Sequence, residues 1–296
     1  MEDKMRLGVV NMQARSGNKA ENLEKILFFI EAAAKEKIDL LLFPELALHG
    51  YDYFIEATMP WEAKHEYADT LDSKSCMQIK AVAMAHGIHI VYGMAEKKAN
   101  KMYNAAVLLN PKKDEVVSYH KIHPYDKENM AFTKGKAPLL WETKWGKIGV
   151  GICYDTYQFP ELARYYAHKG ARLYLNPTAL AEEIKLPESR EAFLSYYRLM
   201  LEYNMRTTTM YYASANLVGQ DKESYFGGAS VILGPKETPF SKTAIHYYGG
   251  DLNGIEERLY AAEIDLSLVT RRLFVKNEYA NEPDYRPEVY HHWDID

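Results

Sequence analysis

The sequence predicts an α/β fold in which helices cover two packed β-sheets. Three observations support this fold class: apolar runs typical of strands alternate with amphipathic helical segments, the two halves of the chain resemble each other, and the run LLLF at 40–43 is continuously apolar. Alternating strands and helices are typical of layered α/β proteins. Continuously apolar strands are typical of sheets that are covered on both faces.

The individual elements follow from the spacing of apolar residues and from the residues that end each segment. Helical spacing in the segment 18–37 predicts an amphipathic helix, and the residues that carry the pattern are Leu23, Ile26, Leu27 and Ile30. A second helix is predicted at 75–87, where a glycine ends it, and Cys76 in its first turn is interpreted as structural. Strands are predicted at residues 6–12, 39–45, 88–96 and 104–110.

An internal repeat organises these elements into two halves. Three segments of the first half return in the same order in the second: RLGVVNM (6–12) as KIGVGIC (147–153), DLLLFPE (39–45) as RLYLNPT (172–178), and AAVLLNP (105–111) as ASVILGP (229–235). The order predicts two βαβ-type halves related by a pseudo-twofold axis. Two such sheets, packed face to face with helices outside, would be buried on both faces.

Composition limits the class of protein. The 296 residues include 47% hydrophobic and 26% charged residues, with a net charge of -5, so one globular domain without a nucleic-acid surface is expected. Two cysteines are too few for a disulfide framework and favour a cytoplasmic setting. The sequence predicts neither a signal peptide at the N-terminus nor a membrane span, so no membrane partner is expected.

Three chemically reactive residues come directly after predicted strands. Glu45 follows LLLFP, Lys121 follows EVVSYH, and Cys153 follows KIGVGI. Each residue alone is also consistent with a structural position, a solvated strand end or, for the cysteine, a small buried hydrophobe. Ligand sites in α/β sheets lie beyond the carboxyl ends of strands, so the three together predict one site.

An acid, an ammonium and a thiol form a set that suits acyl transfer. A free thiol has a pKa of about 8.5 and is mostly protonated at neutral pH, so a carboxylate near it serves as general base. A lysine ammonium and the backbone N–H groups after the cysteine stabilise the oxyanion that forms after attack. The sequence therefore predicts a nucleophilic cysteine that works without histidine.

These segments resemble the nitrilase superfamily, the carbon–nitrogen hydrolases. The resemblance is carried by FPELALHGYD (43–52), YHKIHPYDKENMAFTKG (119–135) and GICYDTYQFPELAR (151–164), and it extends over nearly the whole chain. It implies a four-layer αββα sandwich of the nitrilase type. It also implies a carbon–nitrogen hydrolase domain at 1–275 and a C-terminal tail at 276–296 that packs on a partner subunit.

The resemblance also assigns roles to residues. It implies that Glu45 is the base, Lys121 the oxyanion stabiliser and Cys153 the nucleophile. Glu128 stands at the spacing of the family's second glutamate, ahead of Phe132 and Gly135, and is expected to position the substrate. Tyr51 and Tyr154 are expected to position the substrate as well, since they follow Glu45 and Cys153 in the chain.

Two departures from the family pattern concern the surroundings of the cysteine. The segment from Cys153 to FPE contains one extra residue, near Tyr157 or Gln158, which is expected to reshape the pocket wall. Thr207 and Thr208 stand where the family commonly has Glu and Asn, so a supporting polar network is expected to differ.

The predicted function is hydrolysis of a small amide to an acid and ammonia through a cysteine thioester, an activity of class EC 3.5. Tyr154 and Asp155 after the cysteine resemble the amidase-like branch. A nitrilase and an N-carbamoyl-amine or amino acid amidohydrolase are the alternatives, although no arginine for a carboxylate clamp follows Cys153. An alternative of another class is a catalytically idle scaffold.

Cofactors and partners are expected to be few. His120 and His123 stand three apart, but no further ligand has metal-site spacing, so neither a metal nor another cofactor is expected. The expected partners are the small-molecule amide and a second copy of the chain, in a homodimer or larger homo-oligomer, because the aromatic tail needs a surface to pack against.

Overall fold

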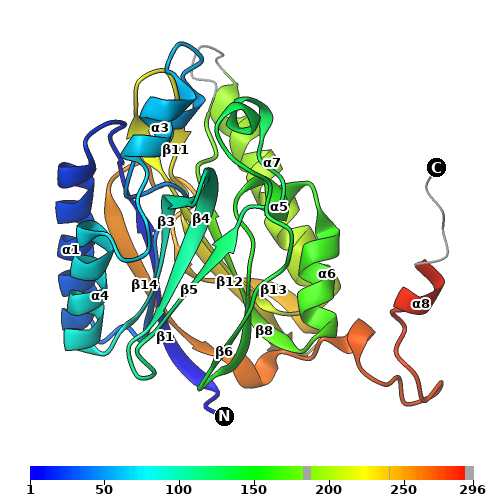
Figure 1. Cartoon of the computed structure of the whole chain (residues 1–296). Helices are drawn as coiled ribbons and strands as arrows, with labels where there is room; N and C mark the ends of the chain where they lie inside the picture. Colours follow the sequence, from blue (N-terminus) through cyan, green and yellow to red (C-terminus); the bar gives the residue numbers. More distant parts are fainter. Residues whose placement is uncertain (183–187, 240, 291–296) are drawn as a thin grey trace.

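The computed structural model describes residues 1–182, 188–239 and 241–290. Two six-stranded sheets pack face to face, and helices cover both outer faces (Figure 1). Helices α1 (Lys19–Lys35) and α4 (Lys74–His86) lie on one side, and helices α6 (Pro160–His168) and α7 (Ser189–Thr208) lie on the other. The predicted four-layer α/β sandwich is therefore confirmed.

The first sheet has the order β14-β1-β2-β3-β4-β5. Strands β1, β2 and β3 run parallel, and β14, β4 and β5 pair antiparallel to their neighbours. The strands are β14 (Arg258–Asp265), β1 (Lys4–Asn11), β2 (Leu40–Leu42), β3 (His89–Lys98), β4 (Lys101–Asn110) and β5 (Glu115–His120).

The second sheet has the order β13-β12-β9-β8-β7-β6. Here β7, β8 and β9 run parallel, and β6, β12 and β13 pair antiparallel. The strands are β13 (Ser241–Gly250), β12 (Val231–Thr238), β9 (Tyr211–Asn216), β8 (Ala171–Thr178), β7 (Gly146–Val150) and β6 (Leu140–Thr143). The pairing pattern repeats that of the first sheet, which confirms the predicted resemblance of the two halves.

Shorter elements connect the sheets at the end where the site lies. They are the helices α2 (Asp52–Ile55), α3 (Trp61–Tyr67) and α5 (Tyr154–Tyr157), the hairpin of β10 (Val218–Gln220) and β11 (Tyr225–Gly227), and the 3-10 turn η1 (Asp126–Met130). Two further 3-10 turns, η2 (Leu266–Leu268) and η3 (Arg272–Phe274), follow β14.

Two separate cores explain why the LLLF run is apolar throughout. Leu40 and Leu42 pack in the core between the sheets, together with Trp141 of the second sheet. Leu41 points the other way, into the core under α1 and α4, where it joins Ile26. Alternate residues of a strand face opposite sides, so a strand covered on both sides needs apolar residues at every position.

The strand predicted at 39–45 is shorter in the structure. The sheet pairing of β2 ends at Leu42, and the prediction is wrong for the last residues of the range. After Pro44 the backbone N–H of Glu45 donates to the Thr178 carbonyl of the other sheet at 3.3 Å, so the chain contacts the second sheet there. Cys76 lies buried in α4, 3.6 Å from the sulfur of Met94.

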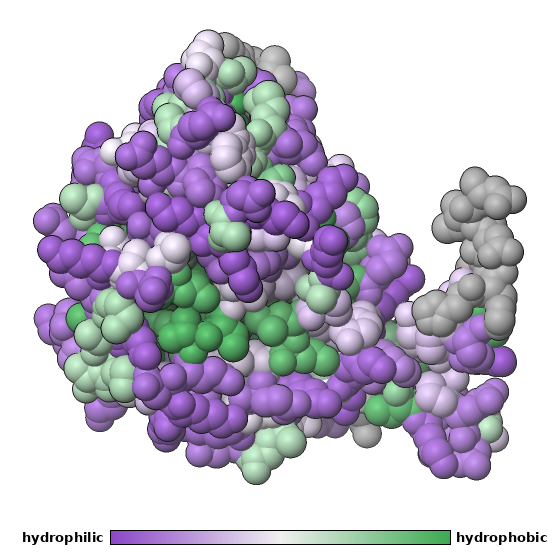
Figure 2. Space-filling model, viewed as in Figure 1, coloured by the Kyte–Doolittle hydropathy of each residue, from purple (hydrophilic) through white to green (hydrophobic). Residues whose placement is uncertain are grey.

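The C-terminal segment leaves the body of the molecule. Residues 276–290 extend to one side and end in the short helix α8 (Pro287–Tyr290), which has no buried residue (Figure 1). The Tyr279 side chain is 91% exposed. Residues 291–296 of the predicted tail lie outside the described residues. Most of the face seen in Figure 2 is hydrophilic, apart from an apolar area near β5 and β6. Among the described residues, no helix combines the length and the apolar character that a membrane crossing requires.

We expect Gly93 of β3 to be essential for stability. A Cβ at this position would lie 2.3 Å from the backbone N of Leu46 and 2.4 Å from the Pro44 carbonyl oxygen. Gly93→Ala is expected to cost about 2–3 kcal/mol of unfolding free energy by overpacking. Gly87→Ala is the control, since Gly87 has open space and the cost there is about 1 kcal/mol from its positive φ. Urea unfolding that finds Gly93→Ala no less stable than Gly87→Ala would contradict this interpretation.

Candidate active site

The structure brings a buried acid and a buried ammonium together from distant parts of the chain. Lys121, directly after β5, donates from Nζ to Glu45 Oε1 at 2.7 Å and to Glu128 Oε1 at 2.8 Å. The residues Glu45, Lys121 and Glu128 are all fully buried. One ammonium therefore holds two carboxylates away from solvent.

The charge of Lys121 is maintained by its partners. Burial alone lowers the pKa of a lysine, but the negative charges of Glu128 and Glu45 outweigh this effect and raise the pKa of Lys121 above its ordinary value. An ammonium has three N–H donors, and the two carboxylates occupy two of them. One donor is left for a further acceptor.

The two oxygens of Glu45 have different surroundings. Oε1 accepts from Lys121 and, at 2.6 Å, from Asn104 Nδ2. Oε2 is buried and has no hydrogen-bond partner among the described residues. Burial, together with the negative charge of Glu128, raises the pKa of Glu45 to about 6, and Lys121 works against this rise. Glu45 is thus poised to exchange a proton near neutral pH.

Cys153 lies on a strained turn between β7 and α5. Its backbone has φ 48° and ψ -103°, a left-handed φ that is rare for a residue with a side chain. The turn is held by its N–H, which donates to the Pro177 carbonyl and to Asn176 Oδ1, both at 3.0 Å. Helix α5 begins at Tyr154, and no acceptor among the described residues takes the Tyr154 N–H.

Electrostatics keep the Cys153 side chain in its thiol form. Burial raises the pKa of the thiol, and the negative charge of Glu45 raises it further, whereas Lys121 lowers it. The side chain is 8% exposed, which leaves the sulfur reachable from one side. A thiol in this position needs a base to become a nucleophile. Glu45 is close enough for its negative charge to raise the pKa of the Cys153 thiol.

Glu128 and Tyr51 form a second part of the cluster. Glu128 lies on the turn η1 and accepts from the Tyr51 hydroxyl at 2.7 Å. Its other oxygen accepts from the backbone N–H of Tyr125 at 3.2 Å and, at 3.5 Å, from Asn104 Nδ2. The carboxylate of Glu128 is therefore fixed on both sides, and the Tyr51 hydroxyl already has a protein partner.

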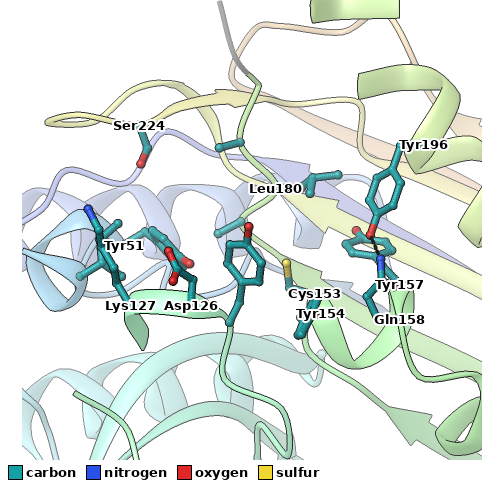
Figure 3. Close-up of a pocket in the computed structure, with 14 residues that line it drawn as sticks. Tyr51, Asp126, Lys127, Cys153, Tyr154, Tyr157, Gln158, Leu180, Tyr196 and Ser224 are labelled. Carbon is teal, nitrogen blue, oxygen red and sulfur yellow. Dashed lines mark hydrogen bonds between the residues drawn. The ribbon is translucent and has the colours of Figure 1, made fainter. Parts of the chain in front are cut away.

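A pocket of about 570 Å³ opens above Cys153. Cys153, Tyr51 and Tyr154 line it, whereas Glu45, Lys121 and Glu128 are not among its lining residues. Figure 3 shows the sulfur between two groups of side chains, Tyr51, Asp126 and Lys127 on one side and Tyr157, Gln158 and Tyr196 on the other. The wall is rich in tyrosine, with the set Tyr51, Tyr125, Tyr154, Tyr157 and Tyr196.

Sequence reasoning missed the asparagines that support the cluster. Asn104 is a buried residue near the start of β4 that joins Glu45 to Glu128, and its backbone carbonyl accepts the Lys121 N–H at 2.8 Å. Asn176 precedes Pro177 and holds the Cys153 turn. The available signal was a polar residue inside an otherwise apolar strand, in YNAAVLLN and RLYLNPT.

The structure shows what the departures from the family pattern contribute. Tyr157 is buried, with its hydroxyl donating to Thr178 Oγ1 at 3.0 Å, and Gln158 donates to the Tyr196 hydroxyl at 2.7 Å, as drawn in Figure 3. The extra residue thus shapes the tyrosine wall. At the other departure, the Thr208 hydroxyl donates to the Asn204 carbonyl at 2.7 Å and lies 2.9 Å from the Tyr212 hydroxyl.

The two histidines beside Lys121 contact different acids. His120 lies 2.9 Å from Glu96, and His123 lies 2.8 Å from Asp155. Within residues 1–182, 188–239 and 241–290, no group of three or more His, Cys, Asp or Glu side chains is arranged to hold a metal ion.

A family model supports the geometric picture. The model of the carbon–nitrogen hydrolases matches residues 6–246. The chain belongs to the carbon–nitrogen hydrolase family. The predicted membership of the nitrilase superfamily, and with it the predicted carbon–nitrogen hydrolase, is confirmed.

Several proteins are similar over nearly the full length of the chain. An omega-amidase NIT2 of Xenopus tropicalis is 28% identical and a probable nitrilase of Schizosaccharomyces pombe is 29% identical, with 89% and 97% of both chains covered. A citrullinase of Francisella tularensis is 35% identical over 58% of this chain and 60% of its own. A double mutant of the amidase from Nesterenkonia sp. AN1, in complex with acrylamide, shares the fold, with a TM-score of 0.75 at 24% identity over 98% of this chain and 97% of its own.

We expect Asn104→Leu to raise the pKa of the Glu45 carboxyl. A hydrogen bond to the ionised form lowers the pKa of an acid, and Asn104 supplies such a bond to Oε1. The check is a pH titration of ¹³C-labelled glutamate side chains by NMR, with Glu45→Gln to assign the signal. The wild-type midpoint is expected at about 6, and the Asn104→Leu midpoint at a higher pH.

The matched control for this titration is Asn110→Leu, at the other end of the same strand. Its midpoint is expected to equal that of the wild type. A midpoint that does not move in Asn104→Leu would show that Asn104 does not stabilise the ionised Glu45.

Proposed function

We propose that Cys153, Glu45 and Lys121 form a catalytic triad that hydrolyses a small amide through a thioester. The observation that carries this proposal is the buried Glu45–Lys121 ion pair, whose charges both act on the Cys153 thiol at the base of the pocket. A buried charge pair next to a nucleophile in a cleft is a typical feature of a catalytic site. A scaffold protein has no need for such a cluster.

In the first half of the reaction, Glu45 accepts the thiol proton at its unpartnered Oε2. The Cys153 sulfur then attacks the amide carbon, and the electron pair of the C=O double bond moves to oxygen. The remaining N–H of Lys121 and the N–H of Tyr154 stabilise the oxyanion. The intermediate expels the nitrogen as it takes the proton from Glu45, and a thioester and ammonia result.

In the second half, Glu45 takes a proton from water while that water attacks the thioester carbon. The second oxyanion accepts hydrogen bonds from the same donors, the N–H groups of Lys121 and Tyr154. Its collapse breaks the C–S bond, and the sulfur recovers the proton from Glu45. The carboxylic acid leaves, and Cys153 returns to the thiol form that its surroundings favour.

We propose that Glu128 positions Lys121 and, through the hydrogen bond to its hydroxyl, Tyr51. Tyr154 contributes its backbone N–H, while its ring forms part of the pocket wall beside Tyr125, 5.0 Å away between centroids. A positioning role for Tyr51 then depends on its ring, since its hydroxyl is held by Glu128.

The class of carbon–nitrogen bond is tested by ammonia release from matched amides, nitriles and carbamoyl compounds. The relatives with similar sequences are named as an omega-amidase, a probable nitrilase and a citrullinase, so all three classes belong in the panel. We expect turnover of amides. Turnover of nitriles alone would overturn the amidase assignment.

We further propose a homodimer or larger homo-oligomer in the cytoplasm. The exposed aromatic segment after residue 275 supports the first part, because Tyr279 is 91% exposed and helix α8 has no buried residue. The two free cysteines support a reducing compartment.

Replacing the nucleophile is expected to abolish turnover. Cys153→Ala removes the attacking atom, whereas Cys76→Ala, at a buried position of the outer helix α4, is expected to keep activity. Lys121→Ala is expected to lower kcat about 100-fold to 1000-fold, the typical cost of losing an oxyanion donor. The exposed Lys136→Ala serves as its control. Amide hydrolysis by purified Cys153→Ala would overturn the assignment.

Glu128→Gln is expected to separate positioning from reactivity. Loss of one anionic partner shifts Lys121, so kcat is expected to fall about 100-fold, a typical result of misplacing a catalytic group. Alkylation of Cys153 by iodoacetamide is expected to persist, since the sulfur itself is untouched. The control is Glu142→Gln on the edge strand β6. Normal turnover in Glu128→Gln would remove Glu128 from the site.

Removal of residues 276–296 is expected to convert the oligomer into monomers. The full-length chain is expected to sediment as a dimer or larger species at micromolar concentration, and the truncated chain as a monomer with an unchanged circular dichroism spectrum. A monomeric full-length chain, or an unchanged assembly after truncation, would contradict the proposed role of the tail.

A further inference from the structure

The pocket is larger than the reacting amide group requires. A volume of about 570 Å³ lies within the roughly 300–1,000 Å³ range of pockets that enclose drug-sized ligands. An amide group occupies only the end at Cys153. The substrate therefore extends away from the reacting carbon, and the outer part of the pocket has to recognise its far end.

Two charged residues stand at this outer part. Asp126 and Lys127 line the pocket and are consecutive on the turn η1, directly before the buried Glu128. Both are exposed, and neither is in an ion pair with any described residue. Their position follows from Glu128: the backbone that places Glu128 against Lys121 also places its two predecessors at the pocket wall (Figure 3).

Two acidic residues next to the pocket lining are paired with cations, whereas Glu223, next to the lining residue Ser224, is exposed. Glu56, next to the lining residue Ile55, pairs with Lys222 at 2.6 Å. Glu182, next to the lining residue Ala181, pairs with Arg190 at 3.0 Å. Among the described lining residues, Asp126 and Lys127 are the ones that carry a charge, one of each sign.

Neighbouring charges of opposite sign discriminate between ligands. A ligand that ends in an ammonium alone would be attracted by Asp126 and repelled by Lys127. A ligand that ends in a carboxylate alone would be attracted by Lys127 and repelled by Asp126. A group that carries both an ammonium and a carboxylate satisfies both side chains at once. The free α-amino and α-carboxylate groups of an amino acid are such a group.

We infer that the substrate is an amino acid whose side chain ends in an amide or carbamoyl group. Asp126 binds the α-ammonium, Lys127 binds the α-carboxylate, and the side chain reaches past the tyrosine wall to Cys153. This inference rests on the proposed function, since it assumes that the reacting carbon lies at Cys153. Asp126 and Lys127 determine specificity and take no part in the chemical steps.

The test measures binding without turnover, on the full-length Cys153→Ala variant, by isothermal titration calorimetry. The probes are L-asparagine, L-glutamine and L-citrulline. Each is compared with analogues that lack the α-amino group, the α-carboxylate or both. At least one amino acid is expected to bind about fivefold or more tightly than each of its analogues, the discrimination that exposed charge pairs typically give.

Charge variants assign this preference to the two residues. Asp126→Asn is expected to remove the preference for the α-amino group, and Lys127→Gln the preference for the α-carboxylate. Each variant is expected to leave the binding of the neutral analogue unchanged. Lys134→Gln, an exposed lysine of the same segment outside the pocket lining, is the control and is expected to change nothing.

The outcomes separate this inference from the proposed function. Equal binding of amino acids and neutral analogues, no binding of any of the three amino acids, or a preference that survives both charge variants would overturn the inference. Hydrolysis of neutral amides by the wild type would leave the proposed function standing in each of those cases. Turnover retained by Cys153→Ala would overturn the proposed function and leave the binding result intact.

Discussion

The ion pair between the buried Lys121 ammonium and the two carboxylates of Glu45 and Glu128 is the constraint on which the site depends. Taking a charge out of water is costly unless a partner of opposite charge and further hydrogen bonds compensate for it. Here the two acids stabilise the ammonium at 2.7 and 2.8 Å, and the ammonium in turn allows two carboxylates to lie side by side. Each member compensates for the burial of the others, so the cluster holds its geometry before any substrate arrives.

The repeat of the fold explains how such a cluster is assembled. Residues after β2 of one sheet meet the last residues of β8 of the other, since the Glu45 N–H donates to the Thr178 carbonyl. The neighbouring Pro177 carbonyl accepts from Cys153. The sandwich therefore brings the Glu45 carboxylate from one half and the Cys153 thiol from the other to a single end of the molecule, and Lys121, which follows the edge strand β5, completes the group.

Much of the fold could be predicted from the sequence, and so could the meeting of Glu45 and Lys121 in one cluster. Strand ends, apolar runs and the internal repeat are local or periodic patterns, and the Glu, Lys and Cys after strands indicated one site only when taken together. The supporting contacts could not be predicted. Asn104 and Asn176 are single polar residues in apolar strands, and the pattern does not say what they contact. The partner of Tyr51 depends on a turn 77 positions further along the chain. The course of the chain after Leu42 depends on a contact with the opposite sheet, from Glu45 to Thr178.

The central claim is that Glu45 is the base that activates Cys153, and the pH dependence of thiol alkylation tests it directly. The rate of Cys153 modification by iodoacetamide is measured by mass spectrometry between pH 5 and 8, in the wild type and in Glu45→Gln. Because Glu45 must be ionised to accept the thiol proton, the wild-type rate is expected to rise with pH through an inflection at about 6. Glu45→Gln is expected to react slowly, without that inflection. The same rate and the same pH profile in both proteins would contradict the account.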